Sequence, residues 1–214
     1  EAVTEELQNT EWDVFVVAAY NKLMPKKFLD MPRRGALNVH PSLLPKFRGP
    51  SPALSAVLAD EKVTGVTVML MNEKMDEGDI IAQARVELED EAWPPKGSLF
   101  EELLATEGGN LLAETLPLWI AGEVEPLPQD HAAATFSRKF TDADAVIDPH
   151  GGREDLLKIR AFDKGPRAYF KDANGKRVIV TEAAMNGSSL ELLKVIPEGK
   201  KEMLYEDYAR GATL

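Results

Sequence analysis

The sequence predicts an α/β protein with two domains, a Rossmann-like domain followed by a small β-rich domain. An almost unbroken apolar run from 13 to 20 is typical of a strand that is buried on both faces of a parallel, helix-covered sheet. Segments with helical spacing alternate with further strand-like runs up to residue 122. Beyond a stretch without periodicity, Asn174-Gly175 separates two strand-like runs, which indicates a hairpin. We therefore expect a first domain over 1–122, a linker over 123–135 and a second domain over 136–214.

The composition favours a soluble, cytoplasmic protein. The chain has 214 residues, of which 44% are hydrophobic, and it contains no Cys, which excludes disulfide and thiolate chemistry. Its apolar runs are shorter than a membrane span requires, and residues 1–10 lack a secretory h-region. We expect no membrane partner.

The net charge of -11 argues against a nucleic-acid partner, but the charge is unevenly spread. The segment from Lys158 to Arg177 carries seven basic residues and two acidic ones. This local excess indicates either a basic patch that binds phosphate groups or the solvated rim of a hairpin, and both alternatives remain open.

The first elements indicate a sheet that begins in the middle of a fold. Residues 1–10 read as the last turns of a helix, residues 25–30 as a short helix, and Ala36–Val39 as a second strand. A doubly wound domain that opens on a helix without a preceding strand is unusual. We therefore expect that an N-terminal part of this domain is missing.

The stretch NVHPSLLPKFRG, from Asn38 to Gly49, combines an amide, an imidazole, a hydroxyl and a guanidinium directly behind the second strand. Ligands of open α/β sheets gather at the carboxyl ends of strands, which favours an active-site loop over a simple turn. His40 precedes Pro41, which biases it to extended backbone angles. Ser51 and Pro52 then start a helix that runs to about Ala59.

Two strands, 64–71 and 80–87, flank the acidic stretch NEKMDEGD at 72–79. The stretch reads as a connecting turn, as a cation loop, or as a loop that turns Asp76 toward the cleft of His40. Its spacing lacks the alternating ligands of an EF-hand, so we expect no metal.

The remaining segments complete both domains. Ser98 and Glu101 match a capping box at the start of a long helix that stops at Gly122, with Gly108, Gly109 and Pro117 expected to loosen or kink it. The second domain is expected to contain a helix over 153–162, the hairpin, a strand over 190–196 and a closing helix over 201–209. These elements indicate a barrel of the oligonucleotide-binding kind.

The sequence resembles the methionyl-tRNA formyltransferases, within the larger family that uses 10-formyltetrahydrofolate. NVHPSLLPKFRG and TGVTVMLMNEKMDEGDII carry the resemblance to the larger family, and ATFSRKFTDADAVID, KIRAFDKGPRAYF and PEGKKEM carry the resemblance to the tail domain of the tRNA enzymes. It covers the whole chain and about the last two-thirds of a typical member. The resemblance implies formyl transfer from 10-formyltetrahydrofolate to the amino group of initiator methionyl-tRNA, by a monomer that releases tetrahydrofolate and requires no metal.

The resemblance also implies the site residues. Asn38, His40 and Asp76 match the catalytic trio of the family. The folate pocket is matched by the following residues: Tyr20, Asn21, Lys22, Leu23, Met24, Ser42, Leu43, Leu44, Pro45, Met71 and Asp79. Ser42 to Pro45 are expected mainly to shape the loop. Two departures stand out: Asn21 replaces a frequent Gly, and the segment 163–167 reads DKGPR where the family usually has NPWPG.

The residue types of the trio suit formyl transfer to an amine. The amide of Asn38 can donate to the oxyanion that forms on the formyl carbon. His40 can donate beside it when protonated or accept the proton of the amine when neutral. A nearby Asp76 would raise the pKa of His40. Arg48 is expected to meet either an anionic group or a structural ion-pair partner.

Three other functions remain open from the sequence. A formyltransferase for amino-sugar nucleotides would share the trio. A non-catalytic RNA-binding protein would use only the tail domain and its basic segment. A folate-binding remnant would retain the pocket without transferring the formyl group.

Overall fold

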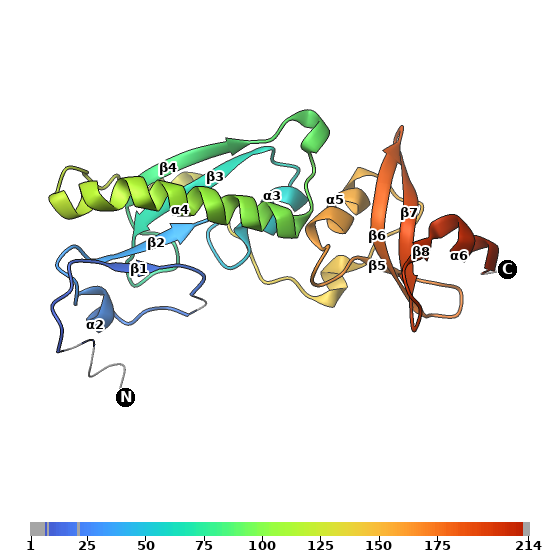
Figure 1. Ribbon diagram of the computed structural model, residues 1–214, viewed down its shortest axis with the longest axis horizontal. Helices are drawn as coiled ribbons and strands as arrows, with labels where there is room; N and C mark the ends of the chain where they lie inside the picture. The colour runs from blue at the N-terminus through green and yellow to red at the C-terminus, as the bar shows by residue number, and fades with distance from the viewer. Residues whose placement is uncertain (1–6, 8, 21, 212–214) are drawn as a thin grey trace. The chain divides into compact units, whose positions relative to one another are not determined.

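The computed structural model describes residues 7, 9–20 and 22–211 (Figure 1). The chain forms two compact units. The first unit comprises Glu1–Ala53, Val63–Leu88 and Glu101–Arg138, and the second comprises Leu54–Lys62, Glu89–Phe100 and Lys139–Leu214. Residues 1–6 and 8, which belong to the predicted N-terminal helix, and Asn21 lie outside the described residues.

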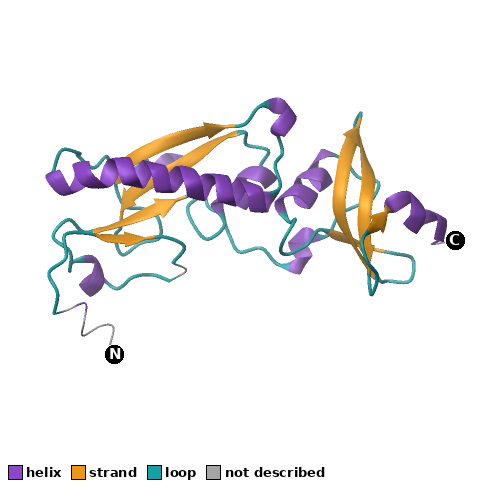
Figure 2. Cartoon of the chain, in the orientation of Figure 1, coloured by secondary structure: helices purple, strands orange, loops and turns teal. Residues whose placement is uncertain are grey.

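The first unit contains a mixed four-stranded sheet (Figure 2). Its strands are β1 (Phe15–Val17), β2 (Ala36–His40), β3 (Val63–Leu70) and β4 (Ile80–Glu87), in that order. β1 and β2 pair in parallel, whereas β2, β3 and β4 pair antiparallel. The short connection between β3 and β4 allows only antiparallel pairing, because a parallel crossover needs a dozen or more residues. The predicted α/β class of this domain is therefore confirmed, and β1 and β2 are the only parallel pair among its described strands.

The predicted first strand is shorter and more exposed than its apolar run suggests. The strand covers Phe15–Val17 rather than residues 13–20. β1 pairs only with β2 among the described strands, and the side chain of Val16 is 46% exposed. The prediction of burial on both faces is therefore wrong, because Val17 is buried whereas Val16, on the opposite face of the strand, is exposed.

One long helix, α4 (Gly97–Ala121), covers a face of this sheet, as Figure 1 shows. Trp119 of the helix packs with Leu37, Val68 and Ile81 from three strands. α4 continues as one helix through Gly108, Gly109 and Pro117, so these residues do not interrupt it. A Cβ at Gly108 would lie 2.6 Å from Val39 Cγ1, so a glycine is needed there for close packing of helix on strand.

The shorter elements around the sheet follow the sequence prediction. Helices α2 (Lys26–Leu29) and α3 (Pro52–Leu58) lie where they were expected. Gly122 ends α4 with a φ of 77°, as a helix C-cap glycine should. Among the described residues, the first unit contains the 3-10 turn η2 (His131–Ala133), and the second unit contains η1 (Asp90–Ala92) and η3 (Asp142–Ala145). No helix of the described part of the chain combines the length and hydropathy that crossing a bilayer requires.

The second unit is β-rich, which confirms the predicted class of the tail domain. It contains α5 (Arg153–Ala161), β5 (Tyr169–Lys171), β6 (Arg177–Asn186), β7 (Ser189–Pro197), β8 (Met203–Leu204) and α6 (Tyr205–Gly211). The four strands pair antiparallel in sequential order. The turn between β5 and β6 contains Gly175 with a φ of 76°, as the Asn-Gly signal predicts. The closing helix, α6, begins at Tyr205 rather than at residue 201, because Met203 and Leu204 form β8 and pair with β7.

The start of α4 differs from the predicted capping box. Ser98 lies inside the helix, and its backbone N–H donates to Asp163 Oδ1 at 2.9 Å. The hydroxyl of Ser98 donates to Asp163 Oδ2 at 2.5 Å. The carboxylate of Asp163, distant in the sequence, therefore accepts hydrogen bonds from the first turn of α4 within the second unit. No local sequence pattern predicts this contact. Asp163 is the first residue of the segment in which the chain departs from the tail-domain motif.

Candidate active site

Strand β2 presents Asn38 and His40 on one face of the sheet. The two residues are separated by one position, and side chains at such positions of a strand point to the same side. His40 is buried at the end of the strand, opposite Thr67 of β3. The amide of Asn38 makes no hydrogen bond to any other described residue, and it is half-buried. It is therefore available to donate to a bound molecule.

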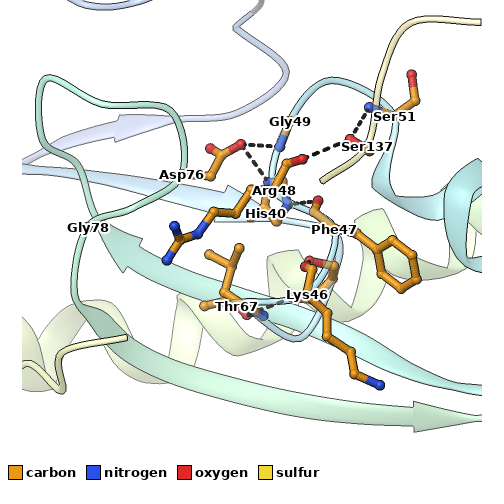
Figure 3. Close-up of polar contacts among 12 residues, drawn as sticks. His40, Lys46, Phe47, Arg48, Gly49, Ser51, Thr67, Asp76, Gly78 and Ser137 are labelled. Carbon is orange, nitrogen blue, oxygen red and sulfur yellow. Dashed lines mark hydrogen bonds and ion pairs between the residues drawn. The ribbon is translucent and has the colours of Figure 1, made fainter. Parts of the chain in front are cut away.

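Both ring nitrogens of His40 face defined groups (Figure 3). Nε2 lies 3.0 Å from the carbonyl oxygen of Phe47, and Nδ1 lies 3.8 Å from Asp76 Oδ2. A carbonyl oxygen only accepts, so Nε2 carries the hydrogen and donates it to Phe47. In the neutral ring, the lone pair therefore sits on Nδ1, the nitrogen that faces the carboxylate.

The loop between β3 and β4 carries Asp76 to this position. The backbone N–H of Gly49 donates to Asp76 Oδ2 at 2.8 Å, which orients the carboxylate. Asp76 has a φ of 53° and Phe47 a φ of 56°, in the left-handed region that residues other than glycine rarely adopt. Such backbone angles persist where the surrounding structure enforces them, and they cluster at functional sites. Both residues that face the ring of His40 have these angles.

Burial decides the charge of His40. Removal from water lowers the pKa of His40 below its usual value of 6.5, although Asp76 and the hydrogen bond to Phe47 act in the opposite direction. Asp76 therefore raises the pKa of His40 as expected, but the effect of burial is larger and sets the net direction. At neutral pH the ring is uncharged, with a lone pair on Nδ1.

This lowered pKa predicts how stability depends on pH. Below about pH 6.5 the unfolded chain takes up a proton at His40 that the folded chain does not, so the free energy of unfolding falls as the pH drops from 6.5 through the folded pKa. We expect denaturant midpoints between pH 7.5 and 5 to fall more steeply in the parent protein than in His40→Gln. His150→Gln, which replaces an exposed histidine, is the matched control and keeps the parent slope. Equal slopes in the parent and His40→Gln would contradict a neutral, buried His40.

The turn behind His40 is built from buried polar contacts. The Ser42 hydroxyl donates to Lys46 O at 2.6 Å, and the Thr67 hydroxyl donates to Ser42 O at 2.6 Å. The backbone N–H of Leu44 donates to Thr67 Oγ1 at 3.1 Å, and Gln83 Nε2 donates to Leu44 O at 2.9 Å. The side chains of Ser42 and Leu44 are buried, whereas those of Leu43 and Pro45 are half-buried. The polar side chains of this turn therefore stabilise its conformation.

The remaining residues expected at the folate pocket are more exposed. Tyr20 is 52% and Leu23 60% exposed, and Lys22 is also exposed, whereas Met24 is half-buried. The half-buried Met71 and Asp79 lie at the ends of β3 and β4, where the Met71 N–H donates to Ala36 O and Asp79 O accepts from Leu70 N. The backbone at 70–71 is therefore tied to the start of the strand that carries Asn38 and His40.

Sequence reasoning missed a buried polar cluster next to the trio. The guanidinium of Arg48 is 2% exposed and donates through Nε and Nη2 to Gln129 Oε1, at 3.1 and 2.8 Å. Nη2 also lies 3.0 Å from Nδ1 of His131, and Nη1 lies 3.8 Å from Glu77 Oε1. Arg48 therefore has a structural ion-pair partner, one of the two outcomes that its sequence left open. Its more numerous contacts come from a segment expected to be a linker.

The acidic stretch 72–79 connects two antiparallel strands. In the described ranges, no three His, Asp or Glu side chains come together as a metal ion would require. The carboxylate of Asp76 faces His40, and the carbonyl oxygens of Asp76 and Gly78 accept from Gln129.

Comparisons with known proteins place the chain among formyltransferases. A family model described as formyl transferase matches residues 1–104. The methionyl-tRNA formyltransferase of Bacillus licheniformis is 36% identical to the chain over 239 aligned positions, which cover all of this chain and 75% of that protein. The methionyl-tRNA formyltransferase of Chloroflexus aggregans is 44% identical over 173 positions, which cover 78% of this chain and 53% of that protein.

Solved structures share the fold at lower identity. HypX of Aquifex aeolicus, in complex with tetrahydrofolic acid, matches with a TM-score of 0.72 and 18% identity, over 98% of this chain and 40% of that chain. A likely sugar N-formyltransferase of Mycobacterium tuberculosis matches with a TM-score of 0.69 and 23% identity, over 87% of this chain and 79% of that chain. At these identities the two structures inform the fold alone.

Proposed function

The chain belongs to the formyl transferase family, among the methionyl-tRNA formyltransferases, and we propose that it moves a formyl group from 10-formyltetrahydrofolate to the amino group of initiator methionyl-tRNA. The protein would act in translation initiation, as a monomer in the cytoplasm. Identity that extends through the second unit to relatives named for the tRNA substrate supports this acceptor over an amino-sugar nucleotide.

The single observation that carries the proposed chemistry is the arrangement of Asn38, His40 and Asp76. Asn38 and His40 lie on one face of β2, and His40 Nδ1 is turned toward the carboxylate of Asp76, which comes from the loop between β3 and β4. This arrangement supplies an amide donor, an uncharged imidazole and an anionic partner at the carboxyl end of a strand.

We assign each residue of the trio one step. The amine attacks the formyl carbon, and the carbonyl oxygen becomes an oxyanion to which the Asn38 amide donates. The neutral Nδ1 of His40 accepts a proton from the attacking amine. The resulting imidazolium is stabilised by Asp76 on one side and by the Phe47 carbonyl on the other. The same proton is then available to the departing folate nitrogen as the tetrahedral intermediate collapses.

The folate would be bound by the segments around 20–24, 42–45, 71 and 79. Their part in the site is proposed from the family pattern. Tyr20 and Leu23 expose apolar surface that a pteridine ring or its linker could cover.

A transfer assay with two acceptors tests the proposed function. The full-length protein that carries this sequence is given 10-formyltetrahydrofolate and either charged initiator methionyl-tRNA or an amino-sugar nucleotide. We expect formyl-methionyl-tRNA and no formylated sugar. Transfer to the sugar alone would overturn the acceptor assignment, and folate binding without transfer to either acceptor would favour a remnant.

A further inference from the structure

The segment from Leu127 to Ser137, which overlaps the predicted linker, contacts both loops that face His40. Leu127 pairs with Ile80, and Phe136 forms a bridge with Arg48. Between these two points, side chains of the segment hydrogen-bond to the loop of Asp76 and to the loop of Phe47. Both loops and the segment belong to the first unit.

Gln129 holds the loop of Asp76 by its side-chain amide. Its Nε2 donates to the carbonyl oxygens of Asp76 and Gly78, at 2.9 and 2.6 Å. Its Oε1 accepts both hydrogen bonds from Arg48. Carbonyls only accept and a guanidinium only donates, so a single orientation of this amide satisfies all four contacts. Gln129 is 5% exposed, so water does not substitute for these partners.

Thr135 holds the loop of Phe47 in a comparable way. Its hydroxyl oxygen accepts from the N–H of Phe47 at 2.8 Å, and its carbonyl accepts from the N–H of Arg48 at 2.9 Å. The carbonyl of Phe47 is the partner of His40 Nε2. Farther along, Ser137 Oγ accepts from the N–H of Ser51 and donates to Arg48 O (Figure 3). The Ser137 N–H also donates to Arg48 O.

The contacts of this segment converge on Asp76 and Phe47, two of the four described non-glycine residues that have a positive φ. Asp76 and Phe47 face opposite nitrogens of the His40 ring, and each is bound at its backbone by one residue of the segment. A non-glycine residue does not keep such angles without support from its surroundings. The geometry around His40 therefore depends on residues that make no hydrogen bond to His40 themselves.

We propose that Gln129 is a positioning residue for Asp76, and that Thr135 plays the same part for His40 through Phe47. The inference rests on the proposed function, since it assumes that the trio performs the transfer. It extends that function to a segment of the chain outside the family motif that defines the site.

The test replaces Gln129 by Glu, which keeps an acceptor for Arg48 but removes both donors to the loop. A carboxylate oxygen then faces the carbonyls of Asp76 and Gly78, and the loop moves. A displacement of about 1 Å costs about 10²-fold in rate, so we expect kcat to fall by about that factor with little change in KM for the folate. The matched control is Glu125→Gln, which makes the reverse change at an exposed position four residues earlier in the chain. This variant leaves kcat unchanged.

A double-mutant comparison separates positioning from general structural damage. If Gln129 acts through Asp76, Gln129→Glu lowers kcat in the parent but causes no further loss in an Asp76→Asn background. The same loss in both backgrounds, or no loss in the parent, overturns the proposal. Parent-like activity of Asp76→Asn alone would instead overturn the proposed function, so the two failures are distinguishable.

A second pair of variants decides the question if Gln129→Glu does not fold. Thr135→Val keeps the shape of the side chain and removes the acceptor for the Phe47 N–H, whereas Thr135→Ser keeps the acceptor. We expect kcat to fall in Thr135→Val and to recover in Thr135→Ser, with thermal midpoints alike in both. Equal kcat values in the two variants contradict the proposal.

Discussion

His40→Gln is expected to lower the rate of formyl transfer by about 10²- to 10⁴-fold, the range typical of a lost general acid-base group. Glutamine can still donate to the Phe47 carbonyl, but it offers no basic nitrogen toward Asp76. The proton of the attacking amine then has no acceptor in the site. Single-turnover formation of formyl-methionyl-tRNA, with saturating folate, measures this loss directly.

The pH dependence of the same reaction shows whether the neutral or the protonated form of His40 is the active one. Because burial lowers its pKa, the parent protein should retain transfer activity below pH 6.5, and activity should decline only as the pH approaches the folded pKa. His150→Gln should reproduce the parent profile. A parent rate that increases on acidification through pH 6.5 would show that the protonated ring is the active form and would contradict the assignment.

Asn38→Ala is expected to lower the transfer rate by about 10²- to 10³-fold, as the removal of one oxyanion donor does in comparable enzymes. The side-chain amide of Asn38 has no hydrogen-bond partner among the described residues. Its removal therefore leaves no described polar group without a partner. The variant should therefore retain the stability of the parent, and binding of tetrahydrofolate should change little. Rapid-quench measurement of the chemical step, together with calorimetric folate binding, separates the two effects.

Asn38→Asp provides a sharper form of this test. Aspartate has nearly the same shape but cannot donate when ionised, and its charge opposes the developing oxyanion. We expect Asn38→Asp to be at least as slow as Asn38→Ala. Parent-like transfer by Asn38→Asp would exclude an amide donor at this position.

The sequence predicts those parts of the site that depend on local pattern. The spacing of Asn38 and His40 places both side chains on one face of a strand, and the structure forms that strand at Ala36–His40. The Asn-Gly hairpin, the C-cap glycine and the helix after Ser51 likewise follow from signals within a few residues. Such features are predictable because their cause and their effect lie close together in the chain.

Features that depend on tertiary contacts were not predictable from the sequence. The contact between Arg48 and Gln129 joins residues 81 positions apart, and neither lies in a periodic pattern that would indicate it. The cap of α4 by Asp163 likewise joins residues 65 positions apart. The net pKa shift of His40 depends on how deeply the fold buries the ring. The lowering of the pKa by burial is larger than the increase caused by the nearby Asp76 carboxylate.

The central claim is that Asn38, His40 and Asp76 together transfer a formyl group to methionyl-tRNA. The most direct test is single-turnover formation of formyl-methionyl-tRNA by the full-length protein and by Asn38→Ala, His40→Gln and Asp76→Asn. We predict that the parent forms the product and that each variant is at least about 10²-fold slower while it remains folded. Near-parental rates in all three variants would contradict the account.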